Sequence, residues 1–149
     1  MDIWDIFLRL FMAIALGGTI GIERETSHKP AGFRTNILIC ISSAMMMILA
    51  RLISGGNETA GDSMRLAAGV ITGVGFLGAG TIIQSRGAIH GLTTASTIWA
   101  VAGLGLVIGA GYYAFAALFT GLVVLTLVLF RKIERLLLEK AEKKHGGQA

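Results

Sequence analysis

Charged residues are scarce over much of this chain, and long apolar runs take their place. No Asp, Glu, Lys or Arg occurs between Arg86 and Arg131, and no acidic residue occurs between Ser63 and Ile133. Charged residues make up 15% of the chain, and the mean hydropathy is +0.72. In soluble domains about a quarter of the residues are charged. A helix that spans a bilayer needs about 20 mostly apolar residues, so these features predict a membrane protein.

Cysteine is also nearly absent. Cys40 is the single cysteine and lies in an apolar run, which excludes an internal disulfide and a cysteine-based metal cluster. We interpret it as a packed structural thiol. No nucleophile with a paired base is found in the pattern of a hydrolase, so we do not expect an enzyme. The N-terminus lacks the basic start of a secretory signal peptide and runs apolar to Ile22, which predicts a retained first span.

Apolar segments separated by charged or turn-rich breaks predict an all-α membrane protein with five spans. One helix through residues 93–130 would be about 57 Å long, nearly twice the hydrocarbon thickness, so a tight turn is expected at residues 109–112. The alternative is four spans with one re-entrant segment. The five expected spans are Ile6–Ile22, Thr35–Ile53, Leu66–Gln84, Thr93–Gly109 and Tyr113–Phe130.

The distribution of Lys and Arg predicts the orientation. Ten of these residues fall in the first connection, the third connection and the tail, whereas Arg51, Arg65 and a snorkelling Arg9 fall on the other side. This predicts an N-terminus outside the cytoplasmic (inner) membrane and a cytoplasmic C-terminus. Six of the basic residues lie after Phe130 without interleaved aromatic residues. They are typical of a tail near anionic lipid, so no nucleic-acid partner is expected.

The stretch GVITGVGFLGAGTII, residues 69–83, contains the spacing G-x-G-x-x-G at Gly73, Gly75 and Gly78. A dinucleotide-binding loop would need a strand before it and an acidic residue about 20 positions later, and that acidic residue is missing. In a membrane, small residues at helical spacing let helix backbones approach closely. Gly69, Gly73 and Gly80 share one face, with Gly75 and Gly78 on a neighbouring stripe, so we interpret them as packing residues. The rival interpretation is a glycine-exposed carbonyl path for an ion.

Glycines in the first span (Gly17, Gly18, Gly21) and in the fourth (Gly103, Gly105, Gly109) extend this pattern. They predict a compact bundle packed through glycine-rich faces. A bundle this small has few internal neighbours for all these faces, so a homodimer is expected within the lipid bilayer.

Charged residues flank the first connection. Glu23 and Arg24 fall at the end of the first span, and Arg34 falls at the start of the second, where a cation opposes the helix dipole. We therefore expect Arg34 to pair with Glu23 or Glu25. This group is either a loop salt bridge or an interfacial site for an ion or partner.

Two further polar groups lie near span ends. Asp62 or Ser63 is expected to cap the third span, and Asp62 is a carboxylate close to the outer end of this glycine-rich span. Thr93, Thr94, Ser96 and Thr97 open the fourth span, where they cap the helix or line a polar path. Magnesium prefers oxygen ligands and usually carboxylates. Asp62 and Glu23 are therefore weak candidates for a magnesium site, and no cofactor is expected.

The tail, residues 131–149, is predicted to be a basic cytoplasmic segment that follows a transmembrane domain at residues 1–130. Its apolar residues have helical spacing. The tail therefore either extends the fifth span or lies along the membrane surface.

Three motifs occur together in this order: IGIERE with KPAGFRT, GVGFLGAGTI, and GLTTASTIW. In this combination, over residues 14–111, the chain resembles the membrane domain of the MgtC/SapB family of bacterial inner-membrane proteins. The resemblance implies a five-span protein associated with magnesium limitation. Some members act in virulence, and some are thought to act on ATP synthase rather than to carry magnesium. The alternative function is a small-ion transporter or channel.

The resemblance also implies which residues matter. The family's motif positions fall here on Glu23, Arg24, Arg34, Thr35, Asp62, Arg65, Gly73, Gly75, Gly78, Gly80, Gly91, Thr93, Thr94 and Trp99. Our functional candidates among them are Glu23, Arg24, Arg34, Asp62, Arg65, Thr93, Thr94 and Trp99. Longer members carry a soluble cytoplasmic domain that we do not expect here, and some carry Asn at the position of Thr93.

Overall fold

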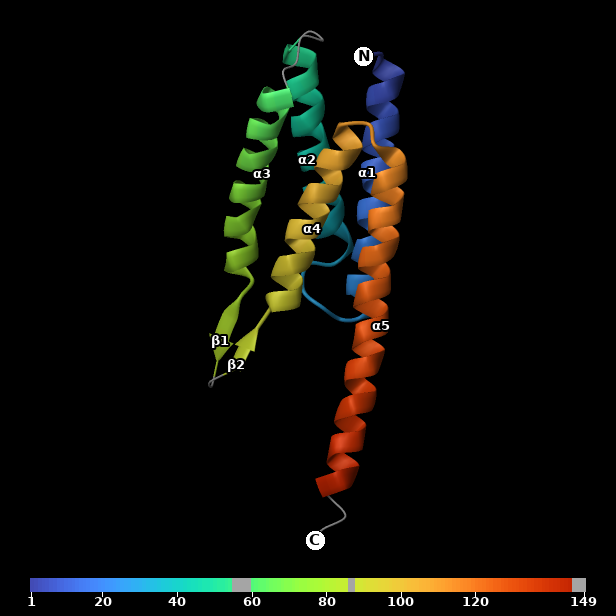
Figure 1. Ribbon diagram of the computed structural model, residues 1–149, viewed down its shortest axis with the longest axis vertical. Coiled ribbons are helices and arrows are strands. Elements are labelled where there is room, and N and C mark those ends of the chain that lie inside the picture. The colour runs from blue at the N-terminus through green and yellow to red at the C-terminus, as the bar shows by residue number, and fades with distance from the viewer. Residues whose placement is uncertain (55–59, 86–87, 146–149) are drawn as a thin grey trace.

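A computed structural model describes residues 1–54, 60–85 and 88–145, and it consists of a helical bundle with one short hairpin (Figure 1). Within these ranges five helices are long and apolar enough to cross a bilayer, which confirms the all-α class and the five spans. The elements are α1 (Ile3–Thr26), α2 (Phe33–Ile53), α3 (Ala60–Gly80), β1 (Ile83–Ser85), β2 (Ala88–His90), α4 (Leu92–Gly109) and α5 (Tyr113–His145).

The two ends of the bundle differ in what they contain. The N-terminus, the end of α2, the start of α3 and the α4–α5 turn lie at one end, which we call the N-terminal end (Figure 1, top). The α1–α2 loop and the β1–β2 hairpin lie at the opposite end, which we call the hairpin end, and α5 extends beyond it. Consecutive helices therefore run in opposite directions, as five sequential spans require.

The turn between α4 and α5 falls where glycine spacing predicts it. Gly111 adopts a left-handed conformation with φ of 91°, which glycine reaches without steric cost. The amides of Ala110, Gly111 and Tyr112 donate to carbonyl oxygens in the last turn of α4. These bonds satisfy the carbonyl groups that a helix end leaves free.

The third span differs from its predicted bounds at both ends. Its helix begins at Ala60, so Asp62 and Ser63 lie inside the first turn and not at the residue before the helix. The helix stops at Gly80, and Ile83 pairs with His90 in an antiparallel hairpin rather than continuing a span to Gln84. Hydropathy does not distinguish a helical Ile from an exposed strand Ile, and Ile83 is 62% exposed.

Helix α2 packs between α1 and α4 at positions where glycine removes the side chain. A Cβ atom on Gly17 would lie 2.7 Å from the Cβ of Cys40, and one on Gly105 would lie 2.7 Å from the Cβ of Ser43. Gly109 meets Met47 in the same way, with 2.7 Å between the corresponding atoms. Gly17 in the first span and Gly105 and Gly109 in the fourth span therefore pack closely against α2, whereas Gly103 has no atom of the described residues within 4 Å of its would-be Cβ. Cys40 is buried at this contact, as predicted.

The glycines of α3 behave differently. Of the five α3 glycines from Gly69 onward, only Gly78 has a neighbour among the described residues, the backbone and side chain of Ala95 at 3.5–3.8 Å from its would-be Cβ. Gly69, Gly73, Gly75 and Gly80 have no atom within 4 Å of that position. Within the protomer this glycine stripe is therefore largely unused, and its role in packing against another molecule stays a prediction.

Replacement of Gly105 by alanine tests the close approach of α4 to α2. We expect Gly105→Ala to destabilise the bundle by about 1–3 kcal/mol, because a methyl group there overpacks the contact. Gly103→Ala on the same helix is the matched control, since nothing lies within 4 Å of its would-be Cβ. Reversible unfolding in mixed micelles measures both free energies of unfolding, and equal losses would contradict the packing.

Candidate functional site

The last turn of α1 carries two adjacent charged residues that are buried at the hairpin end. Glu23 is 8% exposed and Arg24 is 3% exposed. The Oε1 atom of Glu23 accepts a hydrogen bond from the Ser27 hydroxyl at 2.7 Å and pairs with Nη1 of Arg131 at 3.1 Å. The Nη2 atom of Arg24 donates to the Thr94 hydroxyl at 3.0 Å. These contacts connect α1 to α5 and to the start of α4.

The partner predicted for Arg34 is wrong. Among the described residues, ion pairs join Arg9 to Asp5 and Arg131 to Glu23, and neither includes Arg34. Glu25 instead accepts a hydrogen bond from the Phe33 amide at 3.0 Å and so places its negative charge at the start of α2. Arg34 is exposed and lines a separate cavity together with Glu25.

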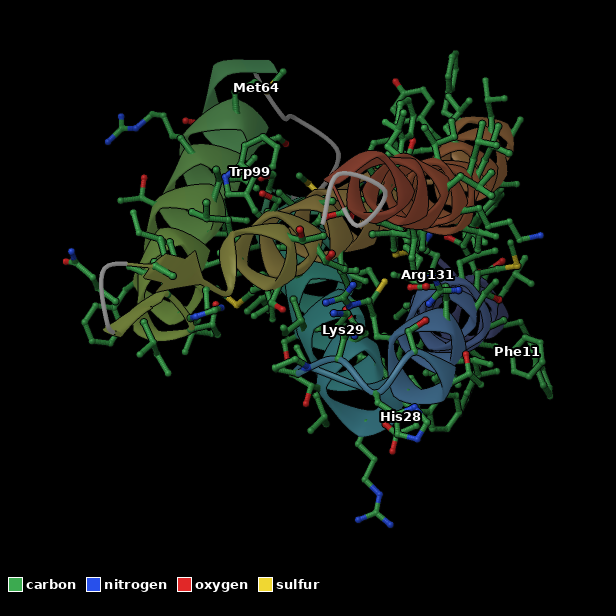
Figure 2. The ribbon with its side chains drawn as sticks, turned by 90° about the horizontal axis from the view of Figure 1, so that it is seen from below. Phe11, His28, Lys29, Met64, Trp99 and Arg131 are labelled. Carbon is green, nitrogen blue, oxygen red and sulfur yellow. The ribbon has the colours of Figure 1, made fainter. Side chains whose placement is uncertain are left out.

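A cavity of about 700 Å³ opens beside the two buried charges. The end of α1, the loop at Lys29 and Pro30, the β2–α4 junction and one side of α5 form its walls. Small-molecule sites commonly have volumes of this order. Figure 2 shows the bundle from the hairpin end, where Lys29 and Arg131 lie toward the middle of the bundle and His28 lies farther out.

Glu23 and Arg24, which line this cavity, each carry one buried polar atom that lacks a hydrogen-bond partner among the described residues. These atoms are Oε2 of Glu23 and Nε of Arg24. A buried polar atom without a partner is costly, and most such atoms in proteins are satisfied. The amide groups at the start of α4 also receive no side-chain cap, because the N-cap residue is Gly91.

The structure brings together half of the predicted functional residues. Glu23, Arg24, Thr93 and Thr94 line the same cavity. Asp62 and Arg65 lie in the first two turns of α3, at the N-terminal end of the bundle. The two weak magnesium candidates, Asp62 and Glu23, therefore cannot share a site. No group of three or more His, Cys, Asp or Glu side chains gathers anywhere in the described part of the chain.

Trp99 stands apart from this site. It lies further along α4, is 53% exposed and is not part of the cavity wall. Arg131, in contrast, lines the cavity, although in the sequence it is one of several basic residues of the predicted tail. No local pattern indicates its pairing with Glu23, because that contact depends on α5 packing along α1.

A second charged cluster, which sequence reasoning missed, lies at the N-terminal end. Arg9 is 7% exposed, pairs with Asp5 at 2.8 Å and donates to the Gly109 carbonyl oxygen. The Tyr113 hydroxyl donates to Asp5 at 3.1 Å. The Arg9 guanidinium therefore reaches the N-terminal end, as expected, but contacts the protein there and is nearly buried. The spacing of Asp5 and Arg9, four residues apart on one helix, is the signal that could have found the pair.

Comparison with known proteins gives a consistent result. A model described as the MgtC family matches residues 10–136. The chain is 46% identical over 121 residues to Protein SapB of Bacillus subtilis, which covers 76% of this chain and 52% of that relative. It is 38% identical over 140 residues to "Putative magnesium transporter YhiD" of Escherichia coli K12, with 91% and 65% covered.

A third relative, Protein MgtC of Brucella abortus, is 36% identical over 136 residues, with 91% of this chain and 56% of that protein covered. The chain thus spans between 52% and 65% of the length of these three relatives. No solved structure matches the chain.

A double-mutant cycle tests the contact between Glu23 and Arg131. We expect Glu23→Gln and Arg131→Gln to be coupled by on the order of 1 kcal/mol in the free energy of unfolding, because each removes the other's partner. The control cycle pairs Glu23→Gln with Arg34→Gln and should give a coupling near zero. Coupling of Glu23 to Arg34 of the same size as to Arg131 would contradict the observed pairing.

Proposed function

The chain belongs to the MgtC family, and on that premise we propose that it supports adaptation to low magnesium by regulating another membrane complex. ATP synthase is one such complex, because the chain resembles family members that are thought to act on it. Because the chain covers less than two thirds of the length of these relatives, the activity proposed is that of this membrane domain.

The observation that carries the proposal is the absence of charge from the middle of the described bundle. Its buried charged residues are Arg9 near one end and Glu23 and Arg24 at the other. The buried residues between them are mainly apolar, and the hydroxyls of Thr97 and Thr120 donate to carbonyl oxygens of their own helices. An ion path through a bilayer normally needs ionisable or polar ligands facing it. A packed apolar core therefore favours a regulatory protein over an ion transporter or channel.

A cation transporter is the second candidate. The name of the Escherichia coli relative favours it, and the exposed glycine stripe of α3 leaves room for a carbonyl-lined path. In that case Asp62, in the first turn of α3, is the carboxylate that we expect a cation to contact at the start of the glycine stripe.

The partner surface proposed is the exposed face of α3. Helices in lipid associate where small residues allow close approach, and the would-be Cβ positions of Gly69 and Gly73 are open. Phe76 and Met64, on the same helix, are 82% and 70% exposed. We propose that this face forms a homodimer and that the regulated complex binds the same bundle.

The orientation proposed places the hairpin end in the cytoplasm and the protein in the inner membrane. Arg24, Lys29, Arg34 and Arg131 lie at the hairpin end, and cytoplasmic ends of membrane proteins carry the excess of Lys and Arg. Thiol labelling of Lys29→Cys and Ser54→Cys in intact cells is the measurement that tests it, because the two sites must label from opposite sides.

Flux assays separate the two candidate functions. We expect purified protein in liposomes to conduct no magnesium, protons or potassium above empty liposomes, because the described core contains no buried charged residue between Arg9 at one end and Glu23 and Arg24 at the other. In cells starved of magnesium, Glu23→Gln should reduce growth while the protein still accumulates, and Arg34→Gln should do the same if its separate cavity holds part of the partner site. Magnesium flux abolished by Asp62→Asn would overturn regulation and support transport.

Replacement of Gly73 tests the dimer face. Gly73→Leu should shift the protein from dimer to monomer in nanodiscs, because a large side chain there separates two closely packed helices. The matched control is Gly121→Leu on α5, which also has no neighbour within 4 Å of its would-be Cβ. Mass photometry reads the mass directly, and a wild-type chain that is monomeric at all concentrations would refute the dimer.

A further inference from the structure

We propose that the cavity at the hairpin end binds a phosphate group. Its walls combine the open N-terminus of α4, the buried guanidinium of Arg24, the loop cation Lys29 and the free carboxylate oxygen of Glu23. This site is independent of whether the protein regulates or transports, since it rests on the geometry of the cavity alone.

The first observation is the start of α4. Its N-cap residue, Gly91, has φ of 91° and no side chain to cap the helix. The first turn begins its bonding with the Ala95 amide, which donates to the Gly91 carbonyl oxygen at 2.9 Å. The amides of Leu92, Thr93 and Thr94 therefore precede any helical acceptor. Together with the helix dipole, such amides attract an anion.

The second, independent observation is Arg24. Its side chain is 97% buried, as its 3% exposure shows, and it lines the cavity with Nε unpartnered. The hydrogen bond that the structure gives to this guanidinium goes to the neutral hydroxyl of Thr94. A guanidinium has five N–H donors and pairs best with carboxylate or phosphate oxygens. The charged groups around the cavity are the cations Arg24, Lys29 and Arg131 and the carboxylates Glu23 and Glu134, which leaves a cation in excess.

Glu23 narrows the chemistry of the ligand. One of its oxygens is taken by Ser27 and Arg131, but Oε2 is free and can only accept a hydrogen bond. A ligand that offers an anionic oxygen to Arg24 and a proton donor to Glu23 therefore complements both residues. A protonated phosphate oxygen meets both demands, and sulfate, which carries no proton at neutral pH, meets only the first. In a phospholipid the donor is the ammonium or hydroxyl group of the headgroup.

Two sources can supply this phosphate. One is free inorganic phosphate from the cytoplasm, and the other is a phospholipid headgroup at the membrane surface. The apolar part of the wall, at Leu92, Leu127 and Phe130, would contact the upper acyl chains in the second case. The experiment below has one arm for each source.

In the first arm, inorganic phosphate is titrated by calorimetry into the full chain in nanodiscs of a phosphatidylcholine, with sulfate titrated in parallel. In the second arm, protein extracted from membranes of phosphatidylethanolamine and phosphatidylglycerol is examined by native mass spectrometry for retained lipid. Saturable binding of phosphate with weaker binding of sulfate supports the free ion as the ligand. Retention of one phospholipid per chain supports the headgroup.

Variants connect either result to the cavity. Arg24→Gln should weaken binding on the order of tenfold, because it removes a charge-assisted hydrogen bond. Lys29→Gln changes an exposed loop residue and should also weaken binding, so it serves if Arg24→Gln does not fold. Arg34→Gln, at the same end but outside this cavity, is the matched control and should bind normally.

Three results would overturn the proposal. They are no binding in either arm, binding that Arg24→Gln and Lys29→Gln leave unchanged, and equal affinity for sulfate and phosphate in the first arm. The first would mean that water alone fills the cavity, and the second that the ligand binds elsewhere. The third would mean that the free oxygen of Glu23 does not face the ligand.

Discussion

The close approach of α1 and α4 to the two sides of α2 is the constraint on which the rest of the structure depends. In lipid, apolar surface gives helices no reason to prefer one another over acyl chains, so contact distance decides which faces meet. Gly17 on one side and Gly105 and Gly109 on the other bring the backbones within reach of Cys40, Ala44 and Met47. This places α1 beside α4, and only then can Arg24 reach Thr94.

Charged residues occupy both ends of the packed bundle, and each cluster joins helices that are distant in sequence. At the N-terminal end Arg9 and Asp5 hold the turn between α4 and α5. At the hairpin end Glu23 and Arg131 hold α5 against α1, while Arg24 contacts α4. The same burial that stabilises these contacts leaves one nitrogen of Arg24 and one oxygen of Glu23 without a hydrogen-bond partner in the part of the chain that the structure describes. The candidate site thus follows from the way the bundle is closed.

Much of the fold could be predicted from sequence, because spans and turns are local properties. Apolar length gives the five helices, and Gly111 gives the turn. Contacts between distant segments could not be predicted. Glu23 pairs with Arg131 and not with nearby Arg34, and at the start of α2 it is Glu25 that accepts a hydrogen bond from the Phe33 amide. The glycines at positions 69–80 of α3 form the clearest stripe in the sequence, yet among the described residues only Gly78 of this stripe has a neighbour. Glycine spacing shows that a face can be approached and does not identify what approaches it.

Helix α5 runs without interruption for 33 residues, from the turn at the N-terminal end to His145. That length is about 50 Å, against a hydrocarbon thickness of about 30 Å, so the helix carries its geometry beyond the lipid. A helix advances by about 100° per residue, and the Glu23–Arg131 contact fixes its rotation at the point where it leaves the bundle. The position of the distal part of α5 relative to the bilayer, and its rotation about the helix axis, are therefore set by contacts within the membrane-spanning bundle.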